Sequence, residues 1–295
     1  MGDCKEPFAV FIGYDGREAV ASDVCKRSIL KRTKSKTSIK YLKHRDLRNA
    51  GLFSRTWVTV GSTGDWIDAV DGKPFSTEFS HTRFLVPHLM KYKGWALFMD
   101  SDMLFMSDIK RLFELCDDKY AAMCVKHHHK PPLGAIKMDG REQINYYRKN
   151  WSSFVLWNCA HPANAGVTME RVSSMRGADL HAFKWLADDL IGELPYTYNF
   201  ISGVSPRLPL EKNGRPDVIH FTDGGPWFPE CPDVPYGDLW LDEYHDWQLS
   251  HGGNIISSIP TASGERRQKP PVEEYKLAVS LDVVDLEAIR MDGEE

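Results

Sequence analysis

Short apolar runs that end in a polar turn are the feature that most limits what this chain can fold into. "FAVFIGYDG" (8–16) and "GWALFMD" (94–100) read as buried strands, and "TSIKYLKH" (37–44) alternates like a half-buried strand. Along the chain between 8–16 and 37–44, "EAVASDVCKRSILKR" (18–32) places apolar residues at helical spacing. Strand, helix, strand is the opening unit of a parallel α/β sheet, so we expect an α/β fold.

Further along the chain, the same patterns predict the remaining elements. We expect helices over 76–92, 107–115 and 180–195, and strands over 119–127, 151–158 and 216–228. Residues 50–75 are rich in Gly, Ser, Thr and Asp and predict a loop with one short element. The prediction is one domain over 1–250, followed by an appendage over 251–295 that is rich in Pro and charge, with a weak helical pattern at 281–291.

The chain has 295 residues and no apolar stretch that approaches the ~18 residues of a membrane span. Its first residues lack the basic and apolar regions of a signal peptide. The six cysteines lie far apart without a C-x-x-C pair, which favours buried thiols. We therefore expect a cytoplasmic protein without a transmembrane segment, with peripheral attachment at the inner membrane surface as a variant.

The net charge of −4 conceals an asymmetry between the two halves. Residues 1–150 hold 26 Lys/Arg against 18 Asp/Glu, whereas residues 151–295 hold 11 against 23. A basic first half is compatible with an anionic ligand such as a nucleotide or nucleic acid. A solvated basic helix at 26–36 explains it equally well.

Two aspartates follow the strand at 94–100. In an extended chain Asp100 and Asp102 point to the same side, about 6.6 Å apart, so both can reach one centre. Carboxylate oxygens suit Mn²⁺ or Mg²⁺, and the carboxyl edge of a parallel sheet is where open α/β folds bind ligands. The alternative is that the two carboxylates only solvate a loop and cap the next helix.

Three features around the aspartates favour the metal hypothesis. Arg83 lies on the preceding helical pattern, in "HTRFLVP", and His220 ends the strand pattern of "VIHFTDGG". A histidine with two aspartates forms a mixed oxygen and nitrogen site that Mn²⁺ accepts. The glycines after His220 would let the backbone approach phosphates closely.

Two other patterns are weaker. Three consecutive histidines in "VKHHHK" (125–130) alternate in direction along an extended chain and cannot easily bind one ion, so we expect at most a contact at the rim of the site. Tryptophans pack in cores more often than they stack on sugars. Trp227, near His220, is the one that we assign to a ligand.

The segments "FIGYDGREAVASDVCKRSI", "TEFSHTRFLVPHL", "GWALFMDSDML", "LPYTYNF" and "HFTDGGPWF" occur in the order seen in one enzyme family. Over residues 8–230 the chain resembles the GT-A-fold glycosyltransferases of family 8, which include glycogenin, and within them a bacterial and phage subgroup. The resemblance implies a mixed, mainly parallel central sheet flanked by helices.

The resemblance also implies roles for individual residues. Asp100, Asp102 and His220 match the manganese ligands, and Arg83 matches an arginine that reaches the donor sugar and its phosphates. Asp188 and Asp189 fall where the family carries a pair near the reacting sugar carbon, so both are assigned to catalysis with Arg83. The residues assigned to donor binding are Tyr14, Asp15, Arg83, Ser101, Gly224, Gly225 and Trp227.

One departure from the family pattern concerns the diphosphate. The family motif ends with a lysine that holds this group, and "HFTDGGPWF" lacks it. We expect the backbone of Gly224 and Gly225, or a basic side chain such as Lys126, to take its place.

The expected function is metal-dependent transfer of a sugar from a nucleotide-diphosphate donor, a UDP-sugar by resemblance, to a saccharide or glycolipid hydroxyl, with retention of configuration. This is a hexosyltransferase-type activity of class EC 2.4. The alternatives are transfer to hydroxymethylated DNA bases, a nucleotidyltransferase, and a non-catalytic nucleotide-sugar-binding protein. No G-x-G-x-x-G follows the first strand, which argues against a nicotinamide oxidoreductase.

Overall fold

The predicted strand–helix–strand opening is present in the structure, a computed structural model that describes residues 7–60, 65–127, 148, 150–206 and 215–250. Strand β1 (Phe8–Tyr14) pairs in parallel with β2 (Thr37–Lys43), and helix α1 (Ala19–Arg32) connects them. All described residues belong to the unit Met1–Pro260. The second unit, Thr261–Glu295, lies outside them, as does the predicted appendage over 251–295.

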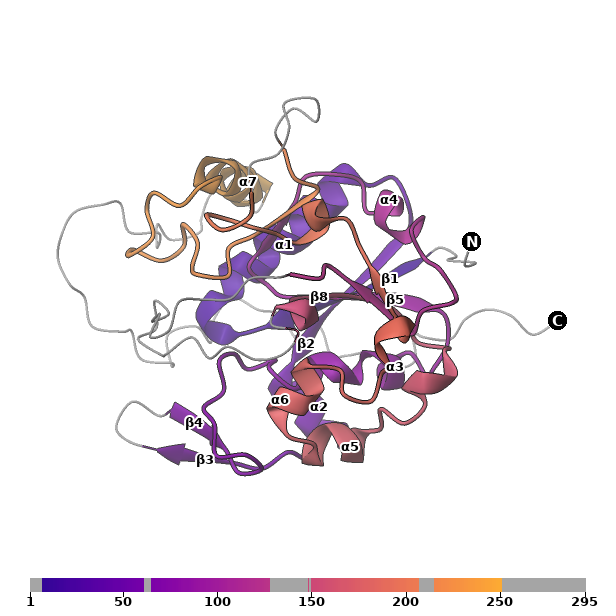
Figure 1. Ribbon diagram of the computed structural model, residues 1–295. Coiled ribbons are helices and arrows are strands. Elements are labelled where there is room, and N and C mark those ends of the chain that lie inside the picture. The colour runs from indigo at the N-terminus through magenta and orange to yellow at the C-terminus, as the bar shows by residue number, and fades with distance from the viewer. Residues whose placement is uncertain (1–6, 61–64, 128–147, 149, 207–214, 251–295) are drawn as a thin grey trace. The chain divides into compact units, whose positions relative to one another are not determined.

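Within the described residues, the largest sheet has six strands in the order β2-β1-β5-β8-β7-β9 (Figure 1). Its other strands are β5 (Trp95–Met99), β7 (Ala122–Cys124), β8 (Phe154–Asn158) and β9 (Ile191–Glu193). β8 runs against its neighbours β5 and β7, whereas the other pairings are parallel. The sheet is therefore mixed and mainly parallel, as expected.

Two smaller sheets contain the other strands found in the described residues. One has the order β10-β11-β6, and the other is a hairpin of β3 and β4. Their bounds are β3 (Trp57–Val60), β4 (Asp65–Asp68), β6 (Met103–Phe105), β10 (Phe200–Ile201) and β11 (Val218–His220). The antiparallel pairing of β11 with β6 brings the segment around residue 220 beside the end of β5.

Helices cover both faces of the central sheet (Figure 1). Besides α1 they are α2 (His44–Asn49), α3 (Val86–Leu89), α4 (Lys110–Phe113), α5 (Met169–Ser174), α6 (Gly177–His181) and α7 (Gly237–Ser250). The short 3₁₀ turns are η1 (Gly16–Glu18), η2 (Thr82–Leu85), η3 (Trp151–Ser153), η4 (Pro162–Asn164), η5 (Asp188–Leu190) and η6 (Tyr196–Asn199).

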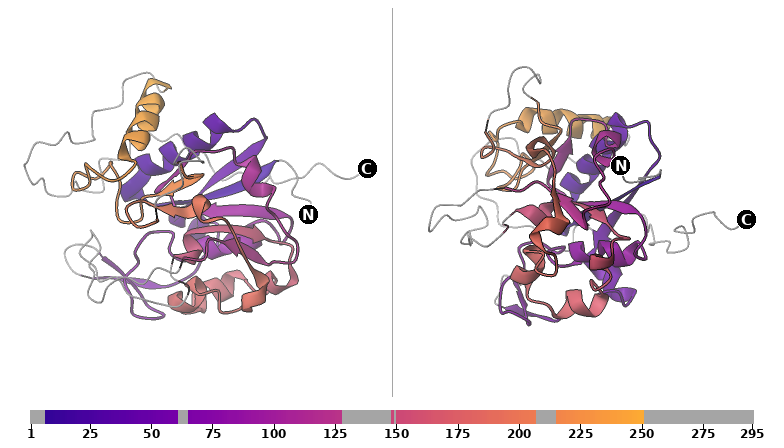
Figure 2. Two further views of the ribbon diagram at one scale, coloured as in Figure 1. Left: turned by 45° about the horizontal axis from the view of Figure 1, so that its top comes forward. Right: turned by 45° about the vertical axis from the view of Figure 1, so that its right-hand side comes forward.

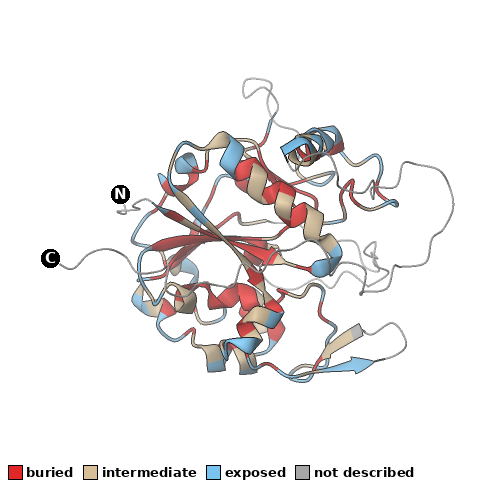
Figure 3. Cartoon of the chain, turned by 180° about the vertical axis from the view of Figure 1, so that it is seen from behind, coloured by how far each residue is buried: buried red, intermediate tan, exposed pale blue. Residues whose placement is uncertain are grey.

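The central strands are buried on both faces (Figure 3). Because side chains alternate along a strand, Phe98 joins a core with α5 and α6, whereas Leu97 and Met99 join a second core with α1 and α4. This double burial explains why "WALFM" reads as a continuous apolar run rather than as an alternating one.

Two sequence expectations about secondary structure were wrong. The segment 180–195 was predicted as one helix, but α6 ends at His181, Phe183 has a positive φ of 48°, and β9 then pairs with β7. The loop prediction for 50–75 missed the β3–β4 hairpin. In the first case a pairing distant in sequence overrides the local helical spacing.

The basic helix α1 packs against α7, and charge on the two helices is complementary (Figures 1 and 2). The buried carboxylate of Glu243 lies 2.8 Å from Arg32 and 3.4 Å from Lys31, and Asp246 contacts Lys31 and Arg27. Part of the positive charge of the first half is therefore balanced within the chain.

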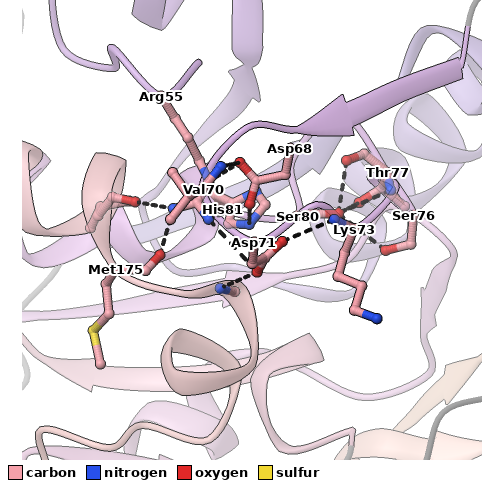
Figure 4. A network of polar contacts seen from close by, with 12 residues as sticks. Arg55, Asp68, Val70, Asp71, Lys73, Ser76, Thr77, Ser80, His81 and Met175 are labelled. Atoms are coloured by element: carbon pink, nitrogen blue, oxygen red, sulfur yellow. Dashed lines mark hydrogen bonds and ion pairs between the residues drawn. The ribbon is translucent and has the colours of Figure 1, made fainter. Parts of the chain in front are cut away.

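A buried ion pair fixes the β3–β4 hairpin to the segment that holds α5 and α6 (Figure 4). The guanidinium of Arg55 makes two contacts with the carboxylate of Asp68 in β4: Nε donates to Oδ1 at 2.9 Å, and Nη2 donates to Oδ2. Both side chains are buried. The same guanidinium donates to the carbonyls of Val172 and Met175. Removing either partner of such a pair destabilises the fold strongly, because the remaining partner is left charged and buried.

Cys25, Cys124, Cys159 and Cys231 are buried free thiols, as expected. Cys116 differs from that expectation, since it is disulfide-bonded. Of the helices in the described ranges, none has the length and apolar character to cross a bilayer.

Candidate functional site

The acidic motif lies at the carboxyl end of β5, as the sequence predicted. The amide of Asp100 donates to the carbonyl of Ser153 at 2.9 Å, which holds the chain as it leaves the sheet. Asp102 precedes β6, where His220 pairs with Met103 and the amide of Phe221 donates to the carbonyl of Asp102 at 2.9 Å. Residues more than a hundred positions apart in sequence are thus neighbours.

Asp100, Asp102 and His220 form a group whose ligand atoms all lie within 4.8 Å of one another. His220 Nε2 is 3.3 Å from Asp102 Oδ1, with the imidazole buried and the carboxylate mostly so. Two carboxylate oxygens and one imidazole nitrogen are a donor set that suits Mn²⁺ and, less well, Mg²⁺. The residues therefore fit a divalent cation.

The pKa values in the group reflect this proximity. Burial is the largest influence on the pKa of Asp102 and would raise it, but the charge and hydrogen bond of His220, together with a backbone hydrogen bond and the charge of Arg83, hold the pKa below its ordinary value. Burial would likewise lower the pKa of His220, and the carboxylate of Asp102 reverses this. Each side chain stabilises the charged form of the other.

Arg83 also reaches the group. Its Nη1 lies 2.9 Å from Asp100 Oδ1 and 3.0 Å from the carbonyl of Ser152, and its guanidinium stacks near Phe79 and Phe98. The structure therefore brings the predicted arginine to the predicted aspartate.

Two residues beside the site were missed from the sequence. Asn199 contacts His220 Nδ1 through Oδ1 at 2.8 Å, and its Nδ2 donates to Ser153 Oγ at 3.0 Å. Glu18, at the start of α1, has a pKa raised to about 8 by burial first and then by Asp102 and Asp15. "LPYTYNF" was recognised as a motif, but nothing in it marked Asn199 as a neighbour of His220.

The predicted donor-binding residues at the end of β1 lie in different environments. Tyr14 is half-buried, its ring 5.7 Å from that of Tyr41, with Lys43 Nζ 5.0 Å above it. Asp15 is buried, and its carboxylate accepts hydrogen bonds from Arg17 and from the amide of residue 78. The partly exposed ring of Tyr14 can stack with a nucleotide base, whereas the carboxylate of Asp15 already holds the turn through these hydrogen bonds.

Trp227 is buried among other aromatic side chains. It is 7% exposed and packs against Phe221 and Trp240, with ring centroids 5.9 and 5.0 Å apart. A Cβ on Gly225 would lie 2.0 Å from the Trp227 ring, so this glycine is required by packing, and Gly224 has a φ of 111° that favours glycine. The structure thus shows Trp227 in a core cluster, and its assignment to a ligand stays a prediction.

Asp188 and Asp189 lie in η5, directly before β9, and their assignment to catalysis stays a prediction. Asp188 is exposed and bound to Arg148, which also donates to backbone carbonyls. The sequence pattern of two acids could not reveal that strand β9 starts directly after them.

Two remaining predictions have different outcomes. Ser101 is buried between the aspartates. Of "VKHHHK", residues 128–130 lie outside the described residues, whereas Lys126 Nζ lies 5.6 Å from the centre of the Trp151 ring.

The chain is similar in sequence to a plant protein. It is 44% identical to Protein CDI of Arabidopsis thaliana over 243 residues, or 82% of this chain and 88% of that protein. No protein-family model matches. This relative is from a plant, and membership of a bacterial and phage subgroup stays a prediction.

In structure the chain resembles glycosyltransferases. The apo form of the bifunctional glycosyltransferase WbbM matches with a TM-score of 0.55 and 15% identity, over 87% of this chain and 54% of WbbM, so the chain spans about half of that protein. An active-site mutant of LgtC matches with a TM-score of 0.50 and 12% identity, over 81% of this chain and 96% of LgtC. At these identities the likeness establishes the fold, which is that of the GT-A glycosyltransferases.

Proposed function

The chain belongs to the family of Protein CDI of Arabidopsis thaliana, and for this member, with its GT-A fold, we propose transfer of a sugar from a nucleotide-diphosphate donor to a hydroxyl acceptor. The observation that carries the proposal is the convergence of Asp100, Asp102 and His220 at the carboxyl edge of the sheet. Open α/β folds bind their ligands at this edge. The domain that performs the reaction would be residues 1–250.

Asp100, Asp102 and His220 would hold a divalent cation, Mn²⁺ in preference to Mg²⁺ because of the imidazole. When bound, the cation supplies positive charge for the leaving diphosphate. Arg83 lies against Asp100 and would add a second, fixed positive charge on the same side. Such charges lower the barrier only where negative charge develops, which is at the leaving group.

The donor base would lie over Tyr14, whose ring is half-buried beside Tyr41. The chain lacks the diphosphate lysine of family 8, so the backbone of the Gly224–Gly225 turn is the proposed phosphate contact. The amide of Gly224 donates to the carbonyl of Phe221 at 2.9 Å, and the proposed donor to the phosphate is therefore the amide of Gly225. Family 8 membership, a UDP-sugar donor, a saccharide or glycolipid acceptor and retention follow from the resemblance and belong to the proposal.

The test is a thermal-shift panel of UDP-, GDP-, CMP- and dTDP-sugars, each with and without Mn²⁺. One nucleotide should raise the midpoint only when Mn²⁺ is present, since a ligand stabilises the state that binds it. Asp102→Asn should abolish this shift, and Asp233→Asn, at an exposed loop position, should retain it. A shift that needs no metal, or that survives in Asp102→Asn, would reject the proposal.

A further inference from the structure

We propose that Asn199 is a positioning residue: it keeps a proton on Nδ1 of His220, so that Nε2 presents its lone pair to the metal. The inference rests on the proposed function, because it concerns the same cation. The metal ligands Asp100 and Asp102 do not hold the hydrogen on Nδ1 of His220, and the inference assigns this task to Asn199.

Asn150, Ser153, Asn199 and His220 are linked by successive hydrogen bonds, and the donor and acceptor of each can be assigned by starting at Asn150. The carbonyl of Asn150 can only accept, so Ser153 Oγ donates to it, at 2.9 Å. The lone pair of that hydroxyl then accepts from Asn199 Nδ2 at 3.0 Å. This fixes which end of the Asn199 amide is the NH₂ group, a choice that distances alone leave open.

The other end of the amide determines the state of His220. Asn199 Oδ1 faces His220 Nδ1 at 2.8 Å, and an amide oxygen can only accept, so Nδ1 must carry a hydrogen. All three side chains are buried, which leaves little room for water to take over either contact. In neutral His220 the lone pair is therefore on Nε2.

This assignment matters because Asp102 favours the opposite tautomer. Its Oδ1 lies 3.3 Å from Nε2 and would attract a hydrogen there. A neutral imidazole with its hydrogen on Nε2 has no lone pair at that atom for a cation. The hydrogen bond to Asn199 opposes this tautomer, which is the function of an outer partner of a metal-binding histidine.

The same turn also positions the first aspartate. Ser153 lies in η3, and its carbonyl accepts the amide of Asp100 at 2.9 Å while its hydroxyl accepts from Asn199. One residue thus sets the relative placement of Asp100 and, through Asn199, of His220. Both ends of the proposed cation site depend on a single buried serine.

Three variants test the inference. Asn199→Leu keeps nearly the same volume but cannot accept from Nδ1, whereas Asn199→Asp retains an acceptor. Asn164→Leu is the matched control, since Asn164 is also fully buried and bonds carbonyls through its amide, in a different part of the fold. All three are checked for folding by circular dichroism.

The first readout is ¹⁵N NMR of the imidazoles in metal-free protein, at a pH where His220 is neutral, with the His220 signal identified from its loss in His220→Gln. Wild type and Asn199→Asp should show the hydrogen on Nδ1, and Asn199→Leu should shift it to Nε2. The second readout is titration with Mn²⁺ alone. Asn199→Leu should bind Mn²⁺ about 10- to 100-fold more weakly, whereas Asn199→Asp and Asn164→Leu should bind like wild type.

The outcomes separate this inference from the proposed function. An unchanged tautomer in folded Asn199→Leu, or Mn²⁺ binding equal to wild type, overturns the role of Asn199 and leaves the metal proposal standing. If wild type binds no Mn²⁺, the metal proposal fails, and the NMR tautomer alone decides whether Asn199 positions His220. Equal weakening in Asn164→Leu would mean that any buried defect has this effect, which also overturns the inference.

Discussion

Replacing Glu18 by glutamine should stabilise the protein, and the effect should grow with pH. The pKa of Glu18 is raised from 4.5 to about 8 by burial and by the nearby Asp102. At pH 7 the carboxylate of the unfolded chain must therefore take up a proton on folding, which costs about 3 kcal/mol at 1.36 kcal/mol per pH unit. Glutamine is neutral and of equal size, and avoids this cost.

The sign follows from proton counting. Between pH 4.5 and 8 the folded protein binds more protons at this position than the unfolded chain does, so the wild type loses stability as pH rises. Because Glu18 is only partly buried by surface area, we expect Glu18→Gln to gain about 2–3 kcal/mol at pH 7 and less than about 1 kcal/mol at pH 5.

The assay is urea unfolding at pH 5, 6, 7 and 8, with Glu230→Gln as a control at an exposed position. The control should be nearly neutral throughout. Added Mn²⁺ should reduce the difference in unfolding free energy between wild type and Glu18→Gln, because a cation at Asp100 and Asp102 would favour the ionised form of the Glu18 carboxylate. A difference that does not vary with pH, or a variant less stable than wild type at pH 8, would refute the reasoning.

Three further predictions concern the fold around the site. Arg55→Ala should destabilise the protein by about 3–5 kcal/mol in urea unfolding, because it leaves Asp68 buried without its guanidinium; a loss below about 1 kcal/mol would show that the carboxylate finds another partner. Gly225→Ala should cost about 2 kcal/mol or more, since the new methyl meets the Trp227 ring, and an unchanged melting temperature would contradict this packing. His81 has a pKa lowered to about 3 by burial and then by Arg55, so unfolding takes up a proton below pH 6.5. Between pH 7 and pH 5 the free energy of unfolding of the wild type should therefore fall by about 2 kcal/mol more than that of His81→Gln. If both free energies vary equally with pH, His81 takes up no proton on unfolding.

The sequence predicted the part of the fold that short-range periodicity controls. β1, α1, β2 and β5 occur where apolar runs or helical spacing predicted them, because their burial follows directly from their own side chains. β9 was predicted as part of a helix, because a strand of three residues is too short to show the alternating pattern of apolar and polar residues. The β3–β4 hairpin is stabilised partly by Arg55, whose partners are distant in sequence.

The site shows the same division. Asp100 and Asp102 could be recognised locally, because two acids directly after an apolar strand are costly unless a ligand or partner compensates. His220 was linked to them by its place at the end of a strand pattern and by resemblance, and the pairing of β11 with β6 places it there. Asn199 and Glu18 gain their importance only from neighbours that the sequence does not place, and the burial of Trp227 is likewise seen only in the fold.

The most direct test of the metal proposal is anomalous diffraction at the manganese edge from crystals grown with Mn²⁺ and UDP. The account predicts one strong peak in direct coordination with Asp100, Asp102 and His220 Nε2, next to the diphosphate, and its loss in crystals of Asp102→Asn. A diphosphate bound without a peak there, or manganese held by other residues, would contradict it.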